Sequence, residues 1–82
     1  MRREDFEQYI DVKLANMKGE FIDLVSGDVH RKIGGYPSAN HRMPVCCSVM
    51  YGRMRGDDRV ISAPEKGKGA TLQIRYFKKN RL

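Results

Sequence analysis

The chain has 82 residues, of which 16 are Lys or Arg, 10 are Asp or Glu and 2 are His, so its net charge is +6 with neutral histidines. This length predicts a single domain over residues 1–82, with a short basic tail at 78–82. It leaves little room for a large catalytic apparatus, and no apolar run approaches the ~18 residues that span a bilayer. The charged start of the chain lacks the apolar segment of a secretory signal, so we expect a cytoplasmic protein.

The first element expected is a helix. Apolar residues recur there at helical spacing and form one stripe. They are Phe6, Tyr9, Ile10, Leu14 and Met17. Acidic residues gather near its start and lysines toward its end, which suits the helix dipole, and Gly19 is expected to end it. Residues 20–25 are rich in strand formers and predict a short strand.

Two further helices are expected in the middle of the chain. The first covers residues 27–33, with Ser26 as its N-cap and with Val29 and Ile33 buried. Two glycines end it, and residues 36–40 form a turn-rich connection. The next helix begins near Asn40 or at Pro44, because proline is tolerated in a first helical turn, and it extends to residue 54.

That helix divides into two faces at 100° per residue. Its apolar side has Met43 and Cys47 near its edge and consists of Cys46, Val49, Met50 and Met54. The opposite side is small and polar, with His41, Ser48, Gly52 and Arg55. Such a face can approach another surface closely, although a solvated face has the same composition.

The last third of the chain predicts two strands, at 59–63 and 71–76. In the second strand Leu72, Ile74 and Tyr76 alternate with polar residues and share one face. A glycine-rich loop over residues 64–70 joins the strands into a hairpin and carries two lysines.

The positive charge is unevenly distributed. Residues 1–25 carry four Lys or Arg against six Asp or Glu, whereas residues 26–82 carry twelve against four. An asymmetry of this kind is typical of proteins that bind a polyanion, and also of a simply basic surface.

In layout the chain resembles a winged helix-turn-helix domain. The residues that carry the resemblance are Ser26–Ile33, the break at 34–40, the helix ending at Met54, and the loop around Lys66 and Lys68. The resemblance implies an α+β fold of three helices, a short strand and a C-terminal β-hairpin. One departure is the break between the two helices, which is longer than the three or four residues of the standard turn.

The same resemblance implies duplex DNA as the partner of a small bacterial or phage regulator, which would be associated with the nucleoid. The helix around 41–54 would read the major groove, and the wing at 64–70 would contact phosphates, with or without sequence specificity. The candidate contacts are His41, Arg42, Ser48, Tyr51 and Arg55 on the helix, Lys66 and Lys68 on the wing, and Arg31 and Lys32 as backbone clamps. Arg42 is the candidate for a bidentate contact with guanine.

Several alternatives remain open at this point. One is a protein-interaction module on the same scaffold, another is RNA binding, and a homodimer is a further alternative. No enzyme activity and no cofactor are expected. Two histidines and two cysteines invite a metal hypothesis, but Cys46 and Cys47 lie about 100° apart on a helix and cannot easily face one ion, so we expect no metal site. Cys47 could alternatively act as a redox-sensing thiol.

Overall fold

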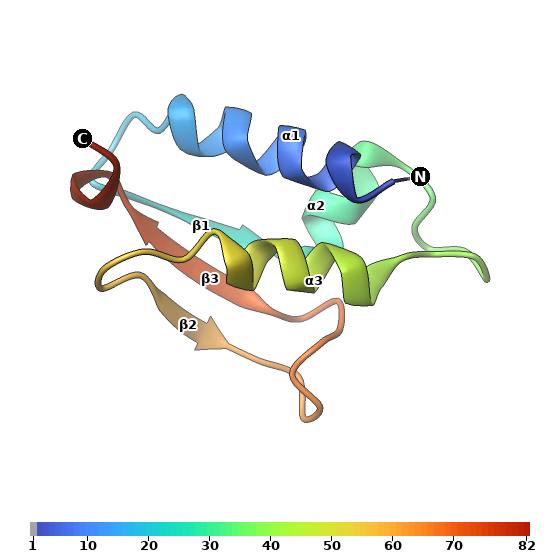
Figure 1. Cartoon of the computed structure of the whole chain (residues 1–82). Helices are drawn as coiled ribbons and strands as arrows, with labels where there is room; N and C mark the ends of the chain where they lie inside the picture. The colour runs from blue at the N-terminus through green and yellow to red at the C-terminus, as the bar shows by residue number, and fades with distance from the viewer. Residues whose placement is uncertain (1) are drawn as a thin grey trace.

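The computed structural model describes residues 2–82 and confirms the α+β class, with three α-helices and a three-stranded antiparallel sheet (Figure 1). The elements are α1 (Arg3–Ala15), β1 (Phe21–Val25), α2 (Ser26–Ile33), α3 (Met43–Gly52), β2 (Arg59–Ser62), β3 (Gln73–Phe77) and the 3-10 helix η1 (Lys78–Arg81).

The strand β3 lies at the centre of the sheet, in the order β1-β3-β2. Leu24 of β1 lies opposite Ile74 of β3, and Ile74 also faces Val60 of β2. β2 and β3 are antiparallel neighbours, but β3 pairs with β1 as well. The predicted C-terminal hairpin is therefore part of a three-stranded sheet rather than a separate unit.

The helices cover one face of this sheet, and the core lies between the two layers. Leu72, Ile74 and Tyr76 are fully buried, which confirms the alternation expected from the sequence. They meet apolar residues of the helices, including Phe6 of α1 and Met50 of α3. Tyr76 also donates its hydroxyl proton to the carbonyl oxygen of Met50 at 2.8 Å, so the buried phenol is satisfied.

The end of α1 differs from the prediction. The helix stops at Ala15, and Asn16 is its C-cap. The backbone N–H of Asn16 makes the last helical bond, to the carbonyl oxygen of Val12 at 3.1 Å, and its side-chain amide donates to the same oxygen at 2.8 Å. A local side-chain bond of this kind competes with continuation of the helix. Gly19 therefore lies outside α1, and Met17 is buried from the following loop.

The N-cap prediction for Ser26 was wrong. Val25 is the N-cap of α2, while Ser26 is the first helical residue, is fully buried, and donates its hydroxyl proton to the carbonyl oxygen of Gly69. The third helix begins at Met43, so Pro44 lies in its first turn, and it ends at Gly52 rather than at residue 54.

The segment expected to be a basic tail is folded back as η1. It is held by Asp58, whose carboxylate is buried in the connection between α3 and β2. This carboxylate accepts the backbone N–H of Arg55 and that of Phe77, each at 2.8 Å. It also accepts side-chain donors from Asn80 and Arg81, each at 2.7 Å. One acidic residue thus fastens the end of the chain to the body.

We expect Asp58 to make the fold sensitive to acid. Burial alone raises the pKa of Asp58, but its hydrogen bonds, led by that from Arg81, outweigh burial and lower this pKa to about 2, from an ordinary value of 3.8. The stabilisation is therefore complete above the ordinary pKa and is lost as the pH falls from about 4 to about 2. Asp58→Asn should lower the free energy of unfolding at neutral pH by about 3 kcal/mol and flatten its fall over that range, as measured by urea denaturation.

Asp57→Asn is the matched control, because the Asp57 carboxylate is exposed and makes only surface contacts, with Lys79 at 2.8 Å and with the side chain of Asn80 at 3.0 Å. Its free energy of unfolding should stay close to that of the unchanged chain. Equal effects of the two substitutions would contradict the role assigned to Asp58.

Candidate nucleic-acid interface

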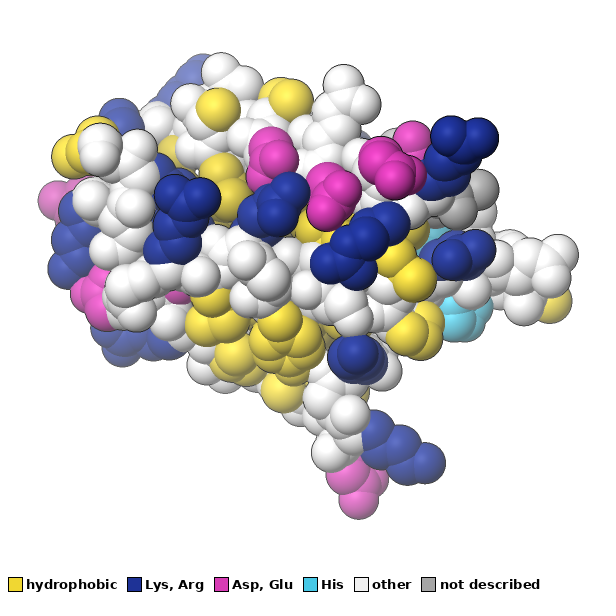
Figure 2. All heavy atoms as spheres, in the orientation of Figure 1, with side chains coloured by type: hydrophobic (Ala, Val, Ile, Leu, Met, Phe, Trp, Pro, Cys, Tyr) yellow, Lys and Arg dark blue, Asp and Glu magenta, His cyan; other side chains and the backbone are white. Residues whose placement is uncertain are grey.

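The part of the chain that contains α3 has no acidic residues. Residues 29–56 contain no Asp or Glu but hold five Lys or Arg. Figure 2 shows Lys and Arg side chains at the level of α3 and on the loop that projects below it, while most of the acidic side chains on this view gather higher, over α1. Lys and Arg therefore predominate in this part of the sequence, although Arg53, which follows α3, pairs with Asp11 of α1 at 2.7 Å.

α3 has a buried and an outward face as expected, but three residues predicted to lie on them, His41, Met54 and Arg55, are outside the helix. Its buried residues are Met43, Cys46, Cys47, Val49 and Met50. On the outward side Ser48 is half-buried and Gly52 is exposed, and a Cβ added at Gly52 would meet no atom within 4 Å. The helix backbone is therefore open to close approach along this side.

The start of α3 is fastened by a buried histidine of α2. The backbone N–H of Arg42, the N-cap of α3, donates to Nε2 of His30 at 3.0 Å. Nδ1 of His30 lies 3.0 Å from the carbonyl oxygen of Gly34. Since that carbonyl only accepts, the proton resides on Nδ1, and the neutral imidazole joins the end of α2 to the beginning of α3.

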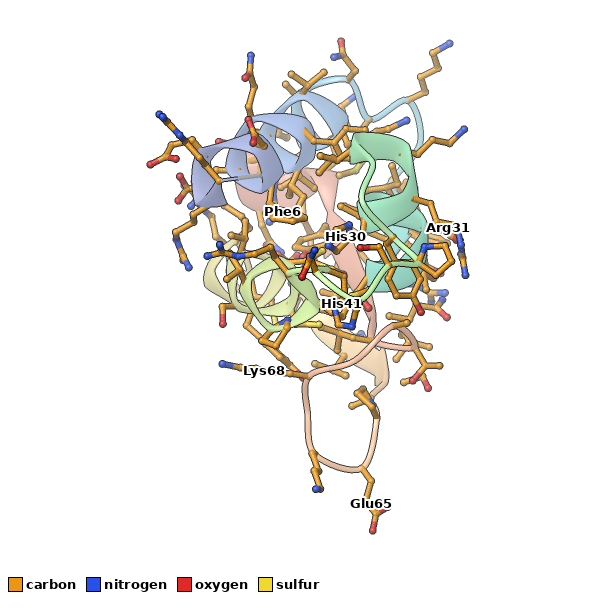
Figure 3. All side chains as sticks on the ribbon, turned by 90° about the vertical axis from the view of Figure 1, so that its right-hand side faces the viewer. Phe6, His30, Arg31, His41, Glu65 and Lys68 are labelled. Carbon is orange, nitrogen blue, oxygen red and sulfur yellow. The ribbon has the colours of Figure 1, made fainter. Side chains whose placement is uncertain are left out.

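Aromatic packing completes this junction (Figure 3). The His30 ring meets Phe6 of α1 edge-on, with centroids 5.0 Å apart, and it packs against Tyr36 at 5.5 Å. His41 lies 5.6 Å from Tyr36, and its Nδ1 accepts the backbone N–H of Met43 at 3.2 Å. The long break between α2 and α3 is thus positioned by rings rather than by a tight turn.

The loop between β2 and β3 is fastened to α3 as well. Tyr51 donates its hydroxyl proton to the carbonyl oxygen of Gly67 at 2.6 Å, and the Cys47 thiol donates to that of Gly69 at 3.3 Å. On the α2 side, the Gly27 N–H donates to the carbonyl oxygen of Ala70 at 2.9 Å. A Cβ at Gly27 would lie 2.8 Å from that oxygen, so only glycine fits there.

The lysines of this loop are exposed but differ in their surroundings. Glu65 lies at the very tip, next to Lys66 in the sequence (Figure 3). Its carboxylate offsets part of the positive charge expected at the tip. Lys68 lies nearer the base and points to the side of the molecule that carries α3 in that view.

The predicted contacts fall into two groups. Five cations are exposed and have no carboxylate partner among the described residues: Lys32, Arg42, Arg55, Lys66 and Lys68. Arg31 differs from these, because it pairs with Asp28 at 3.1 Å and lies over the Tyr36 ring. In Figure 3 it points to the side opposite Lys68.

Position along α3 separates the remaining candidates. His41 and Arg42 lie at its start, and Ser48 lies on its outward side. Arg55 follows the end of the helix, away from this start. Tyr51 is engaged through its hydroxyl by the loop, so its role in the free protein is to position the loop.

The cysteines are buried and contribute to the core. Both have no exposed surface, and burial raises the pKa of Cys46 to about 12. Burial likewise raises the pKa of Cys47 and outweighs its hydrogen bonds and the nearby charge of Lys68. The thiol therefore stays protonated, which contradicts the redox-sensor alternative. Among residues 2–82, no three His, Cys, Asp or Glu side chains are placed to hold a metal ion.

The sequence interpretation missed the structural role of His30, although a signal for it exists. Ser26, Val29, His30 and Ile33 recur at helical spacing and form the inward stripe of α2. A histidine on such a stripe predicts a buried ring whose two nitrogens both need partners.

Comparisons with known protein families, with curated proteins and with solved structures gave no match to this chain. The functional argument therefore depends on its own residues. No helix within the described part of the chain is both long enough and apolar enough to cross a membrane.

Removal of the Tyr51 hydroxyl should loosen the loop without unfolding the domain. Tyr51→Phe keeps the ring but loses the bond to Gly67, so we expect the free energy of unfolding to fall by about 1 kcal/mol and the backbone order parameters of residues 65–69 to drop. ¹⁵N relaxation measures the second effect. Tyr9→Phe on α1 is the control and should leave this loop unchanged; unchanged order parameters in Tyr51→Phe would contradict the positioning role.

Proposed function

We propose that the chain binds duplex DNA as a small bacterial or phage regulator, with the start of α3 in the major groove and the β2–β3 loop on phosphates. The order of elements, with the helices on one face of an antiparallel sheet, is compatible with a winged helix-turn-helix domain. In that arrangement the second helix of the motif, here α3, is the reading helix.

The observation that carries the proposal is the placement of unpaired cations. Arg42 at the start of α3 and Lys68 beside the helix have no carboxylate partner among the described residues. Cations that are not neutralised internally are free to displace counterions from phosphates. The fastened loop keeps these charges in a fixed relation to α3, which lowers the conformational cost of binding.

Each part of the interface has a distinct task in this proposal. The Arg42 guanidinium offers two parallel N–H donors, which match the O6 and N7 acceptors of guanine. Lys66 and Lys68 supply phosphate contacts that do not depend on sequence. The small residues Ser48 and Gly52 allow the helix backbone to lie close to the groove floor.

The double substitution Lys66→Ala/Lys68→Ala tests the loop. If both lysines contact phosphates, affinity for duplex DNA should fall roughly tenfold or more at moderate salt, and the slope of log K against log salt should decrease by about 0.9 for each lost contact. Fluorescence anisotropy titrations of a labelled duplex at several salt concentrations measure both quantities. Lys13→Ala/Lys18→Ala, which removes the same charge from the α1 end of the domain, is the matched control.

Equal losses in the two double variants would show that total charge, not the loop, governs binding. Absence of binding to any duplex at low salt, or tighter binding to duplex RNA or single strands, would overturn the proposal. Circular dichroism of each variant establishes that the fold is intact.

Arg42→Lys separates charge from geometry. The substitution keeps the positive charge but loses the planar fork, so it should reduce discrimination between a preferred and an unrelated sequence by about 1–3 kcal/mol while changing non-specific affinity little. Selection from a random duplex pool identifies the preferred sequence, and competition titrations measure the ratio. A ratio unchanged in Arg42→Lys would remove Arg42 from base reading.

A further inference from the structure

β2 forms a free edge of the sheet. Its hydrogen-bonding partner is β3, and the sheet order places no other described strand beside it. All four of its residues, Arg59–Ser62, are exposed. An edge of this kind presents backbone N–H and C=O groups that can pair with another strand.

This edge also carries exposed apolar surface. Val60 and Ile61 are 39% and 42% exposed, and they lie next to each other in β2. Val60 faces Ile74 across the sheet, so its side chain lies on the face covered by the helices. Figure 2 shows hydrophobic side chains gathered between α3 and the projecting loop, over β2. Apolar patches beside a free edge are typical of interaction sites.

The usual protection of an edge strand is weak here. β2 contains neither lysine nor proline, and its one charged residue, Arg59, lies over the Phe77 ring at 5.5 Å rather than standing free. Two protective features remain, the short length of β2, which has four residues, and a bulge between Val60 and Ser62, which leaves Ile61 without a partner on β3.

We propose that β2 is the interface with a second copy of this chain, in which the two β2 strands pair antiparallel about a two-fold axis. In the register centred between Val60 and Ile61, Val60 of each copy faces the partner's Ile61, and Arg59 of each copy faces the partner's Ser62. No like charges oppose one another, and apolar residues meet across the axis. The strand is thus complementary to itself, as an isologous contact requires.

Such a dimer has a defined shape. Antiparallel pairing at an edge merges the two sheets, and the two-fold axis runs through the merged sheet, so both sets of helices lie on the same face. Both copies of α3 are then on one side of the assembly. The inference depends only on β2 and its surroundings, and it holds whether or not the chain binds DNA.

Sedimentation velocity, without nucleic acid, from micromolar to millimolar protein tests the interface. We expect a reversible monomer–dimer equilibrium that Ile61→Lys weakens at least tenfold, because a charge then lies at the two-fold axis. Val12→Lys is the matched control, since Val12 is 53% exposed on α1, and it should dimerise like the unchanged chain. Circular dichroism checks that both variants fold.

Hydrogen exchange locates the contact independently. The amides of residues 59–62 should exchange more slowly as the protein concentration rises, while those at the exposed end of α1 should not change. A chain that stays monomeric at millimolar concentration overturns the inference. So does a dimer that survives Ile61→Lys, is lost in Val12→Lys, or gives β2 no added protection; capture of a different protein by a monomeric chain would assign the edge to another partner.

Discussion

The arrangement of the helices depends on one buried, neutral imidazole. His30 satisfies the carbonyl oxygen of Gly34 at the end of α2 and the N–H of Arg42 at the start of α3. Each of these backbone groups would otherwise remain unpaired next to a buried ring, at a cost of about 1–3 kcal/mol. Because the ring also packs on Phe6, the same side chain relates all three helices. The position of Arg42 at the start of α3 is therefore fixed by this junction.

The position of the loop between β2 and β3 depends on a second set of contacts, in which α2 and α3 bond to the backbone of the loop. The carbonyl oxygen of Gly69 accepts both the Ser26 hydroxyl and the Cys47 thiol, from α2 and α3 respectively. This close approach requires glycine at position 27, because a Cβ there would collide with the backbone of Ala70. Residues that are spread over half the chain therefore fix the base of the loop. The positions of the loop lysines depend on these contacts.

Patterns with local causes could be predicted from the sequence, and contacts with distant causes could not. The alternation of Leu72, Ile74 and Tyr76 requires only that one face of a strand be buried, so it was predicted correctly. The sequence predicted that Gly19 stops α1, but the helix already ends at Ala15, where the side chain of Asn16 bonds to the carbonyl oxygen of Val12. The hydroxyl of Ser26 was assigned to a cap, but its acceptor lies 43 residues away. No local pattern contains such a partner.

The candidate interface illustrates the same distinction for charge. The sequence predicted that positive residues predominate after residue 25, but net charge does not say which cations are engaged in folding. Arg53, Arg75 and Arg81 form close pairs with Asp11, Asp23 and Asp58, at 2.7, 2.8 and 2.7 Å, and these pairs join distant parts of the chain. The positive charge of these three arginines is therefore neutralised by carboxylates of the same chain. Arg42, at the start of α3, and Lys66 and Lys68, on the loop between β2 and β3, have no such partner among residues 2–82. The charge available to a polyanion is therefore the remainder after internal pairing, and that remainder includes the cations at the start of α3 and on its neighbouring loop.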